Sequence, residues 1–293
     1  AELFQETQKL KSNRSKPTSK PLAGKTLAMI FQKPSTRTTV SFAVAASELG
    51  GYPLVLNTQD LQMKRGESIP DTARTLSLYV HGIMIRANRH DDVAELARHA
   101  KVPVINGLTD KEHPCQALGD LFTIFEKRNL KKVSELKQFK LVYLGDGNNV
   151  AHSLMLLAAT IGMDMTVSSP KNYEPEKEFV QKSNELAKTT GAKITIVSAP
   201  TQAASGADVI YTDVWASMGK EEEREHRKQI FTPYQVNSPL LAFAKPDVQL
   251  MHCLPAHRGE EITDEVMDGP RSIVFEQAEN RLHIQKSILQ FLM

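Results

Sequence analysis

The sequence has little cysteine, little net charge and no long apolar run. Two cysteines, Cys115 and Cys253, lie far apart in the 293 residues and argue against a disulfide framework. A formal net charge of +2 is too small to indicate nucleic-acid binding. No apolar run reaches the ~18 residues of a membrane-spanning helix. We therefore expect no nucleic-acid partner, no membrane partner and a reducing compartment.

The first residues of the sequence do not contain the apolar core of a signal peptide. The first residues are polar, so we expect a cytoplasmic protein. An organelle matrix, reached with a transit peptide that is later removed, is the alternative.

What is present is the composition of a globular protein, with 41% hydrophobic and 24% charged residues. The length suits two domains of ~100–200 residues each. Short apolar runs alternate with segments of helical period, a pattern typical of parallel α/β domains. We predict strands at 26–31, 53–57, 82–87, 103–106, 139–145, 165–168, 193–197, 208–212 and 248–253. In the first half we predict helices at 36–49, 71–78, 91–100 and 114–127.

A polar stretch at residues 129–138 separates the two halves of this pattern. We therefore predict two parallel-sheet α/β domains, residues 1–132 and 133–277, with the active site in the interdomain cleft. Residues 278–293 have apolar positions at helical spacing and are predicted to pack back on one of the two domains.

The most informative motif is Ser35-Thr36-Arg37-Thr38, which follows the strand at 26–31 and opens a helix. Free N–H groups at a helix start favour an anion such as phosphate, and an arginine adds charged hydrogen bonds. The simpler explanation is that Ser35 only caps the helix and that Arg37 is a surface charge.

Further motifs follow in a fixed order. They are Asp60-Leu61-Gln62, Arg86 at a strand end, His113-Pro114-Cys115-Gln116, Asp213-Val214-Trp215-Ala216-Ser217-Met218-Gly219 and His252-Cys253-Leu254-Pro255. Several of these residues have a simple structural explanation alone: His113 as a turn residue, Asp213 as the end of a strand, Met218 as a core residue and Cys253 as an inert buried thiol. Together and in this order they resemble the aspartate/ornithine carbamoyltransferase superfamily, and the last two resemble its ornithine branch.

The resemblance implies transfer of a carbamoyl group from carbamoyl phosphate to the side-chain amine of L-ornithine, as in arginine biosynthesis. The substrate is already activated, so positioning and electrostatics would suffice, and no cofactor is expected. A homotrimer is implied, in which Gln62 enters a neighbour's site. Alternatives are putrescine or N-acetylornithine as acceptor, or a catalytically silent protein on the same fold.

The resemblance also implies roles for individual residues. Carbamoyl phosphate would be bound by Ser35, Thr36, Arg37, Thr38, Gln62, Arg86, His113, Gln116, Cys253, Leu254 and Arg281. Ornithine would be bound by Asn149, Asp213, Ser217 and Met218. Residues 1–132 would then form the carbamoyl-phosphate-binding domain, with the helix at 278–293 packed back on it, and residues 133–277 the ornithine-binding domain. Within these sets Arg86, His113 and Cys253 would be catalytic.

Two weaker patterns are rejected. The stretch 141–149 resembles a dinucleotide fingerprint, but Val150 replaces its third glycine and no acidic residue ends the next strand. His252, Cys253 and His257 could be metal ligands, but neighbouring residues on a strand point to opposite faces. We therefore predict no metal.

Overall fold

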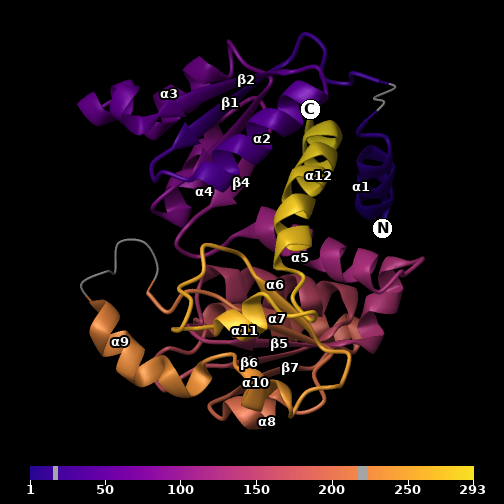
Figure 1. The fold of residues 1–293 in the computed structure, drawn as a ribbon. Coiled ribbons are helices and arrows are strands. Elements are labelled where there is room, and N and C mark those ends of the chain that lie inside the picture. The colour runs from indigo at the N-terminus through magenta and orange to yellow at the C-terminus, as the bar shows by residue number, and fades with distance from the viewer. Residues whose placement is uncertain (16–18, 217–222) are drawn as a thin grey trace. The chain divides into compact units, whose positions relative to one another are not determined.

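The computed structural model describes most of the chain, namely residues 1–15, 19–216 and 223–293. These residues form two compact units: unit 1 comprises Ala1–Phe122 with Glu279–Met293, and unit 2 comprises Thr123–Ala278. Each unit has its own parallel sheet surrounded by helices (Figure 1). The predicted class of two parallel-sheet α/β domains is therefore confirmed. Among the described residues, no helix is long and apolar enough to cross a membrane.

The sheet of unit 1 has four strands in the order β2-β1-β3-β4, all parallel. They are β1 Thr26–Phe31, β2 Tyr52–Asn57, β3 Gly82–Arg86 and β4 Val104–Leu108. The two central strands, β1 and β3, are almost entirely buried, because helices cover both faces of a parallel sheet. Their apolar runs are therefore continuous and do not alternate with polar residues.

The helices of unit 1 are α1 Glu2–Ser12, α2 Thr36–Glu48, α3 Ile69–Leu76, α4 His90–His99 and most of α5 Pro114–Lys127, with the short 3-10 helices η1 Thr58–Asp60 and η2 Gln62–Arg65. Side chains of α3 and α4, including Ala73, Val93 and Leu96, pack on Ile30 and Ile85 of the sheet.

The C-terminal helix α12, Val274–Leu292, starts in unit 2 and continues into unit 1. There it packs against α1, where the hydroxyls of Thr7 and Ser287 lie 2.8 Å apart and Lys11 Nζ donates to Asn280 Oδ1 at 2.8 Å. The chain passes from unit 1 to unit 2 within α5. The polar stretch at residues 129–138, which suggested the limits 1–132 and 133–277, lies after this crossing point. The two units are defined by compactness alone, so the limits of the carbamoyl-phosphate-binding and ornithine-binding domains stay a prediction.

The sheet of unit 2 has five parallel strands in the order β7-β6-β5-β8-β9. They are β5 Lys140–Leu144, β6 Asp164–Ser168, β7 Ile194–Val197, β8 Val209–Thr212 and β9 Gln249–His252. Its helices are α6 Asn149–Ile161, α7 Lys177–Thr190, α8 Pro200–Ala204, α9 Arg224–Phe231, α10 Ser238–Leu241 and α11 Asp264–Met267, with the 3-10 helices η3 Val133–Gln138 and η5 Thr232–Tyr234.

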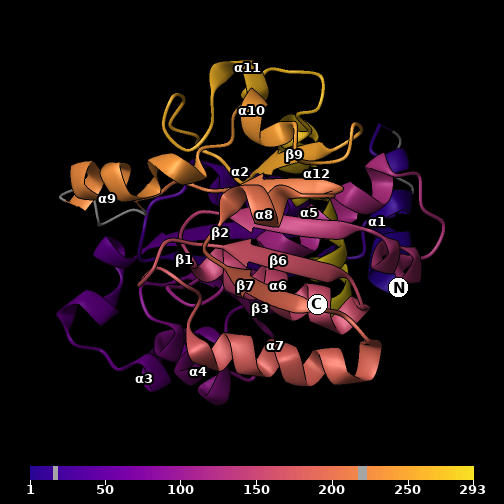
Figure 2. The ribbon, with the colours of Figure 1, turned by 90° about the horizontal axis from the view of Figure 1, so that it is seen from below.

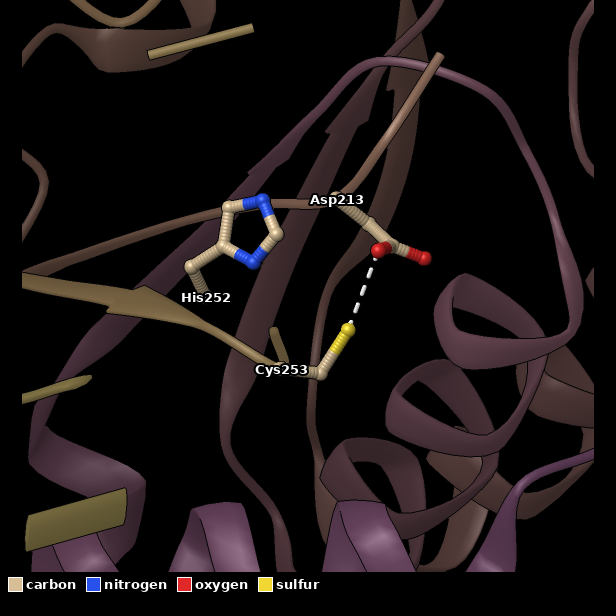
Figure 3. Close-up of side chains that lie close together, drawn as sticks. All are labelled: Asp213, His252 and Cys253. Carbon is tan, nitrogen blue, oxygen red and sulfur yellow. Dashed lines mark hydrogen bonds between the residues drawn. The ribbon is translucent and has the colours of Figure 1, made fainter. Parts of the chain in front are cut away.

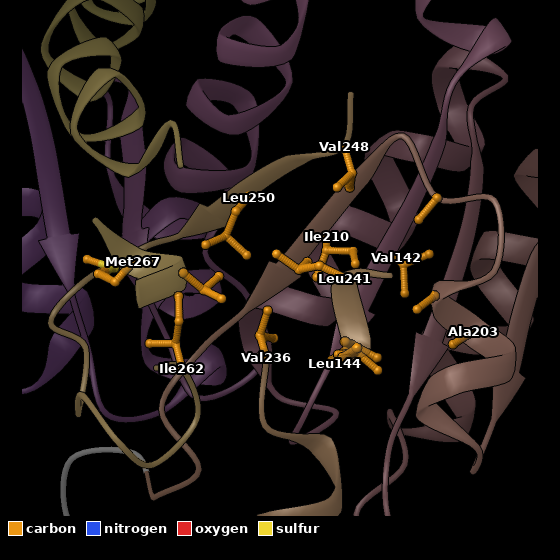
Figure 4. Close-up of a cluster of buried hydrophobic side chains, with 14 of the residues drawn as sticks. Val142, Leu144, Ala203, Ile210, Val236, Leu241, Val248, Leu250, Ile262 and Met267 are labelled. Carbon is orange, nitrogen blue, oxygen red and sulfur yellow. The ribbon is translucent and has the colours of Figure 1, made fainter. Parts of the chain in front are cut away.

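One face of this sheet carries a cluster of buried hydrophobic side chains. Val142, Ile210 and Leu250 come from three adjacent strands and pack against Leu241 of α10 and Met267 of α11 (Figures 2 and 4). Neighbouring positions point to the other face. The order also reverses between β5 and β8, so polar residues that follow these strands gather at the carboxyl edge, where open α/β sheets bind ligands.

Candidate active site

The anion-binding motif of unit 1 forms the start of helix α2. Ser35 is the N-cap residue, and its Oγ accepts a hydrogen bond from the Thr38 N–H at 3.3 Å. Its hydroxyl also lies 3.0 Å from the Thr38 hydroxyl. Thr36 and Arg37 occupy the exposed first turn. The first turn of a helix leaves N–H groups for external acceptors, so capping by Ser35 and binding of an anion are compatible.

Two buried arginines converge on the same turn. Arg86, at the end of β3, donates from Nη1 to Thr38 Oγ1 at 3.5 Å, and Arg281 of α12 donates from Nη2 to this oxygen at 3.1 Å. Arg86 is 9% exposed and Arg281 is 4% exposed. Two guanidinium groups around one hydroxyl concentrate positive charge where an anion with several oxygens can receive charge-assisted hydrogen bonds.

His113 is buried beside these arginines and directly precedes α5. Burial lowers the pKa of His113 well below its usual value of 6.5, and the charges of Arg281 and Arg86 lower this pKa further. The ring is therefore neutral near pH 7. A neutral imidazole keeps one N–H, so His113 can still donate to a carbonyl oxygen.

Gln116 lies one turn into α5 and is held by a second buried residue. Its Nε2 donates to Asp120 Oδ1 at 2.7 Å, and both residues are almost completely buried. This contact fixes which end of the Gln116 amide is the nitrogen. The amide oxygen is thereby left to accept a hydrogen bond from an NH2 group.

In unit 2, the residues that follow strands β5, β8 and β9 form one hydrogen-bonded group. Cys253 Sγ donates to Asp213 Oδ1 at 3.0 Å (Figure 3), and Asn148 Nδ2 donates to Asp213 Oδ2 at 2.9 Å. The Val214 N–H donates to Asp213 Oδ1 at 2.8 Å. Asp213 is 8% exposed, so these three donors supply hydrogen bonds to carboxylate oxygens that are largely shielded from water. A carboxylate has about four acceptor positions, so room remains for one more donor.

Tyr143 completes this group from strand β5. Its hydroxyl donates to Asn148 Oδ1 at 3.1 Å. Burial raises the pKa of Tyr143 well above 10.0, and the negative charge of Asp213 raises it further. The phenol therefore stays protonated and remains a donor. Asn148 Oδ1 also accepts from the Val150 and Ala151 N–H groups, so the same side chain caps α6 and orients Asp213.

Both halves of the chain match models of one protein family. Residues 1–126 match the aspartate/ornithine carbamoyltransferase carbamoyl-P binding domain, and residues 137–292 match the corresponding Asp/Orn binding domain. The chain belongs to the aspartate/ornithine carbamoyltransferase family.

Relatives within this family are similar over almost the whole chain. The anabolic ornithine carbamoyltransferase of Pyrococcus furiosus is 57% identical over 93% of this chain and 85% of its own. The ornithine carbamoyltransferase of Methanothermobacter thermautotrophicus is 58% identical over 94% of this chain and 89% of its own.

Solved structures of family members have the same fold. The ornithine carbamoyltransferase structure from Pyrococcus furiosus has a TM-score of 0.94 at 54% identity, over 99% of this chain and 92% of that chain. The structure of the anabolic enzyme from Campylobacter jejuni has a TM-score of 0.91 at 38% identity, over 99% and 93% of the two chains.

The structure brings together some of the residues expected from the family motifs. In unit 1 it groups Ser35, Thr38, Arg86 and Arg281, with His113 adjoining the two arginines, and in unit 2 it joins Asp213 to Cys253. Asn149 is the first residue of α6, next to Asn148. Gln62 lies exposed on η2. The two expected ornithine-binding residues Ser217 and Met218 lie outside the described residues.

The prediction that His252 and Cys253, as neighbours on a strand, point to opposite faces is wrong, so it cannot argue against a metal site. Strand β9 ends at His252, so the alternation of a strand does not extend to Cys253. Potential ligand atoms of these two residues and Asp213 lie within 4.8 Å of one another. Both ring nitrogens of His252 are nevertheless in hydrogen bonds, to the Leu254 N–H and to Glu261. The expectation of no metal stays a prediction.

Sequence reasoning missed three residues that hold the candidate site residues in place: Asn148, Asp120 and Glu261. Asn148 carries a detectable signal, because an asparagine before an apolar helical run is a typical N-cap. Asp120 lies four residues after Gln116, a spacing that places both on one helix face. Glu261 carries no such signal, because a nine-residue separation within a loop does not predict its contact with His252.

Proposed function

We propose that this chain transfers the carbamoyl group of carbamoyl phosphate to the side-chain amine of L-ornithine, giving L-citrulline and phosphate. The observation that carries the proposal is the convergence of Arg86, Arg281 and a neutral His113 near the start of α2. This arrangement provides donors for a phosphate and for a carbonyl oxygen. The anabolic name of the Pyrococcus furiosus relative supports a role in arginine biosynthesis.

The phosphate end of the substrate is assigned to the start of α2. Ser35, Thr36, Arg37 and Thr38 would bind the phosphate oxygens, with Arg281 completing the set. Arg86 would contact both the phosphate and the carbonyl oxygen, and His113 would donate to the carbonyl oxygen. Donors that are fixed before the reaction stabilise the negative charge that develops on this oxygen.

The carbamoyl NH2 group needs acceptors. Gln116 Oε1 is one, because Gln116 Nε2 is engaged with Asp120. The backbone carbonyl of Leu254 is assigned as the second. With donors at the oxygen and acceptors at the NH2 group, the carbonyl carbon would be held in one orientation for attack.

The ornithine assignments rest on Asp213 and its neighbours. The Asp213 carboxylate would pair with the α-ammonium group, while Asn149, Ser217 and Met218 would contact the amino-acid end. Cys253 would lie near the reacting amine. The amine attacks in its neutral form, so the ornithine ammonium, whose pKa should lie near the lysine value of ~10.4, must first lose a proton. A C–N bond forms to the carbonyl carbon, the C–O bond to phosphate breaks, and the proton released by the nitrogen passes to the departing phosphate.

A citrulline assay with the purified chain tests this proposal. Carbamoyl phosphate and L-ornithine together should give citrulline and phosphate in equal amounts, above the spontaneous hydrolysis of carbamoyl phosphate. Either substrate alone should give no citrulline. A folded protein that yields no citrulline would be a catalytically silent member of the family.

We also propose a homotrimer in which Gln62 of one subunit reaches a neighbour's site. The exposed position of Gln62 on η2 supports a role outside its own subunit. Gln62→Ala and Arg37→Ala should each be inactive alone, and mixed trimers should regain activity because some sites hold both native residues. Subunit exchange, followed by native mass spectrometry, is the required control. Full exchange without recovered activity would contradict the shared site.

A further inference from the structure

The imidazole of His252 connects the backbone of Leu254 to the side chain of Glu261 in unit 2. His252 is the last residue of β9 and is completely buried. Its Nδ1 accepts a hydrogen bond from the Leu254 N–H at 2.9 Å, and its Nε2 lies 3.0 Å from Glu261 Oε1. A backbone N–H can only donate, so Nδ1 carries no proton. The proton of the neutral ring is therefore on Nε2, which donates to Glu261.

Glu261 is completely buried and fixes this tautomer. The same oxygen, Oε1, accepts from the His257 N–H at 2.6 Å, so the carboxylate also anchors the chain that follows the Cys253-Leu254 segment. A carboxylate facing Nε2 disfavours the other tautomer, in which Nε2 would be a bare acceptor. Glu261 thereby keeps Nδ1 available for Leu254.

Leu254 needs such a restraint because its backbone is in the left-handed region, with φ of +56°. This conformation is unfavourable for a residue with a side chain and persists where surrounding contacts impose it. The His252 ring provides such a contact through the N–H of Leu254. Rotation of Leu254 toward negative φ would turn the adjoining peptide groups and redirect the Leu254 carbonyl.

We propose that Glu261 is a positioning residue that acts through His252 to orient the Leu254 carbonyl toward the carbamoyl NH2 group. This inference rests on the proposed function, which assigns that carbonyl to carbamoyl phosphate. Glu261 itself contacts no substrate. Its role is to hold the Leu254 carbonyl in place. For this role Glu261 must accept the hydrogen bond from His252 at Oε1, and its negative charge is not required.

A proton relay from Cys253 through His252 to Glu261 is a different role for the same residues, and the geometry disfavours it. The Cys253 thiol donates to Asp213 Oδ1, and the ring nitrogen that would receive its proton is occupied by the Leu254 N–H. Figure 3 shows the thiol directed toward the Asp213 carboxylate. A relay would require the charge of Glu261, whereas positioning would not.

Three variants separate these roles. Glu261→Ala removes the acceptor, and Glu261→Gln keeps an oxygen for His252 while removing the charge. The new amide nitrogen would replace Oε2, which lies 4.0 Å from His257 Nδ1. Glu260→Ala is the matched control, because this neighbouring carboxylate pairs with Arg224 and not with His252.

Binding of phosphonoacetamide, the methylene analogue of carbamoyl phosphate, is measured by calorimetry beside inorganic phosphate, which lacks the NH2 group. Glu261→Ala should weaken phosphonoacetamide about tenfold, the effect of one lost hydrogen bond, and leave phosphate binding unchanged. Glu261→Gln and Glu260→Ala should bind both ligands within about twofold of wild type. Equal weakening of both ligands in Glu261→Ala, or no weakening of either, would overturn the proposal.

The tautomer of His252 is tested separately with long-range 1H–15N NMR of histidine-labelled protein, assigned with His252→Asn. Wild type and Glu261→Gln should show a proton on Nε2, and a proton on Nδ1 would overturn the proposal.

If Glu261→Ala does not fold, Glu261→Leu, which keeps the side-chain volume, takes its place. Loss of phosphonoacetamide affinity in Glu261→Gln would indicate a role for the charge and also contradict positioning. Wild-type protein that binds phosphonoacetamide but forms no citrulline would contradict the proposed function alone.

Discussion

The two groups of candidate site residues differ in charge and in how that charge is held. In unit 1, Arg86 and Arg281 bring two buried guanidinium groups to Thr38, and Arg37 lies on the exposed first turn of the same helix. In unit 2, the one carboxylate of Asp213 is surrounded by neutral donors from Asn148, Cys253 and the backbone.

This difference matches the proposed substrates. A phosphate dianion spreads its charge over several oxygens, so several fixed cations can bind it at once. An α-ammonium group is a single cation, for which one oriented carboxylate suffices. The arginines of the first group should therefore govern carbamoyl phosphate and Asp213 should govern ornithine, so a change at Asp213 should leave the binding of carbamoyl phosphate unchanged.

The largest effect should come from removing a charge in the first group. Arg37→Ala should lower kcat/KM by about 10³-fold or more, because the guanidinium provides fixed stabilisation of phosphate and of the transition state. Steady-state kinetics with varied carbamoyl phosphate measure the loss. Arg98→Ala, which removes an exposed arginine from α4, is the control and should match wild type. Near-normal kcat/KM for Arg37→Ala would remove the phosphate assignment.

The second largest effect concerns the carboxylate of unit 2. Asp213→Ala should lower kcat/KM for ornithine by about 10²-fold or more, because removing one partner of a buried ion pair leaves the substrate ammonium unpaired. Binding of phosphonoacetamide should stay unchanged, which calorimetry measures on the same preparation. Loss of phosphonoacetamide binding together with ornithine activity would break the division between the two groups.

A smaller effect should come from Asp120, which holds Gln116. Asp120→Ala should lower kcat/KM for carbamoyl phosphate by about 30-fold, because Gln116 Nε2 would lose its acceptor and the amide could turn. The KM for ornithine should change little. The double variant with Gln116→Leu provides the control, since Asp120→Ala should add little once Gln116 is gone. Additive effects would assign Asp120 a role independent of Gln116.

The smallest effect is a pH dependence of stability from His113. Its pKa is lowered in the folded state, so below the unfolded value of 6.5 the unfolded chain binds a proton that the folded chain does not. Stability therefore falls as pH falls below 6.5 and is regained above it. Between pH 7.5 and 5.5, His113 should account for about 1.4 kcal/mol of this change. His113→Gln should reduce the change in urea-unfolding free energy by that amount, and an unchanged difference would contradict a neutral buried ring.

The sequence predicted the fold where apolar runs are long and clearly bounded. The structure has strand Thr26–Phe31 and helix Pro114–Lys127 at the predicted positions. Helix α1 was not predicted, because residues 2–12 are mostly polar and their buried contacts, such as Thr7 with Ser287, come from the far end of the chain. The final helix begins at Val274, before the predicted start at residue 278. The apolar pattern did not reveal this first turn, because Phe275 is exposed and so falls outside the buried face of the helix.

The candidate site was predictable to the extent that its residues stand in motifs. The order of motifs identified Arg37, Arg86, His113 and Asp213 without any geometry, although their roles stay predictions. The residues that orient them were not predictable in the same way. Asp213 meets Asn148 only because β5 and β8 are adjacent strands. The positions of two residues in the sequence do not by themselves predict contacts of this kind, which depend on the order of strands in the sheet.

Substrate choice tests the central claim most directly, because ornithine, putrescine and N-acetylornithine share the attacking amine and differ at the end assigned to Asp213. Their kcat/KM values are to be measured on one wild-type preparation at saturating carbamoyl phosphate. A site built for charged groups can reject an analogue that lacks them by 10⁴–10⁵-fold, so ornithine should exceed both analogues by orders of magnitude. A higher kcat/KM for putrescine or N-acetylornithine would contradict the ornithine assignment.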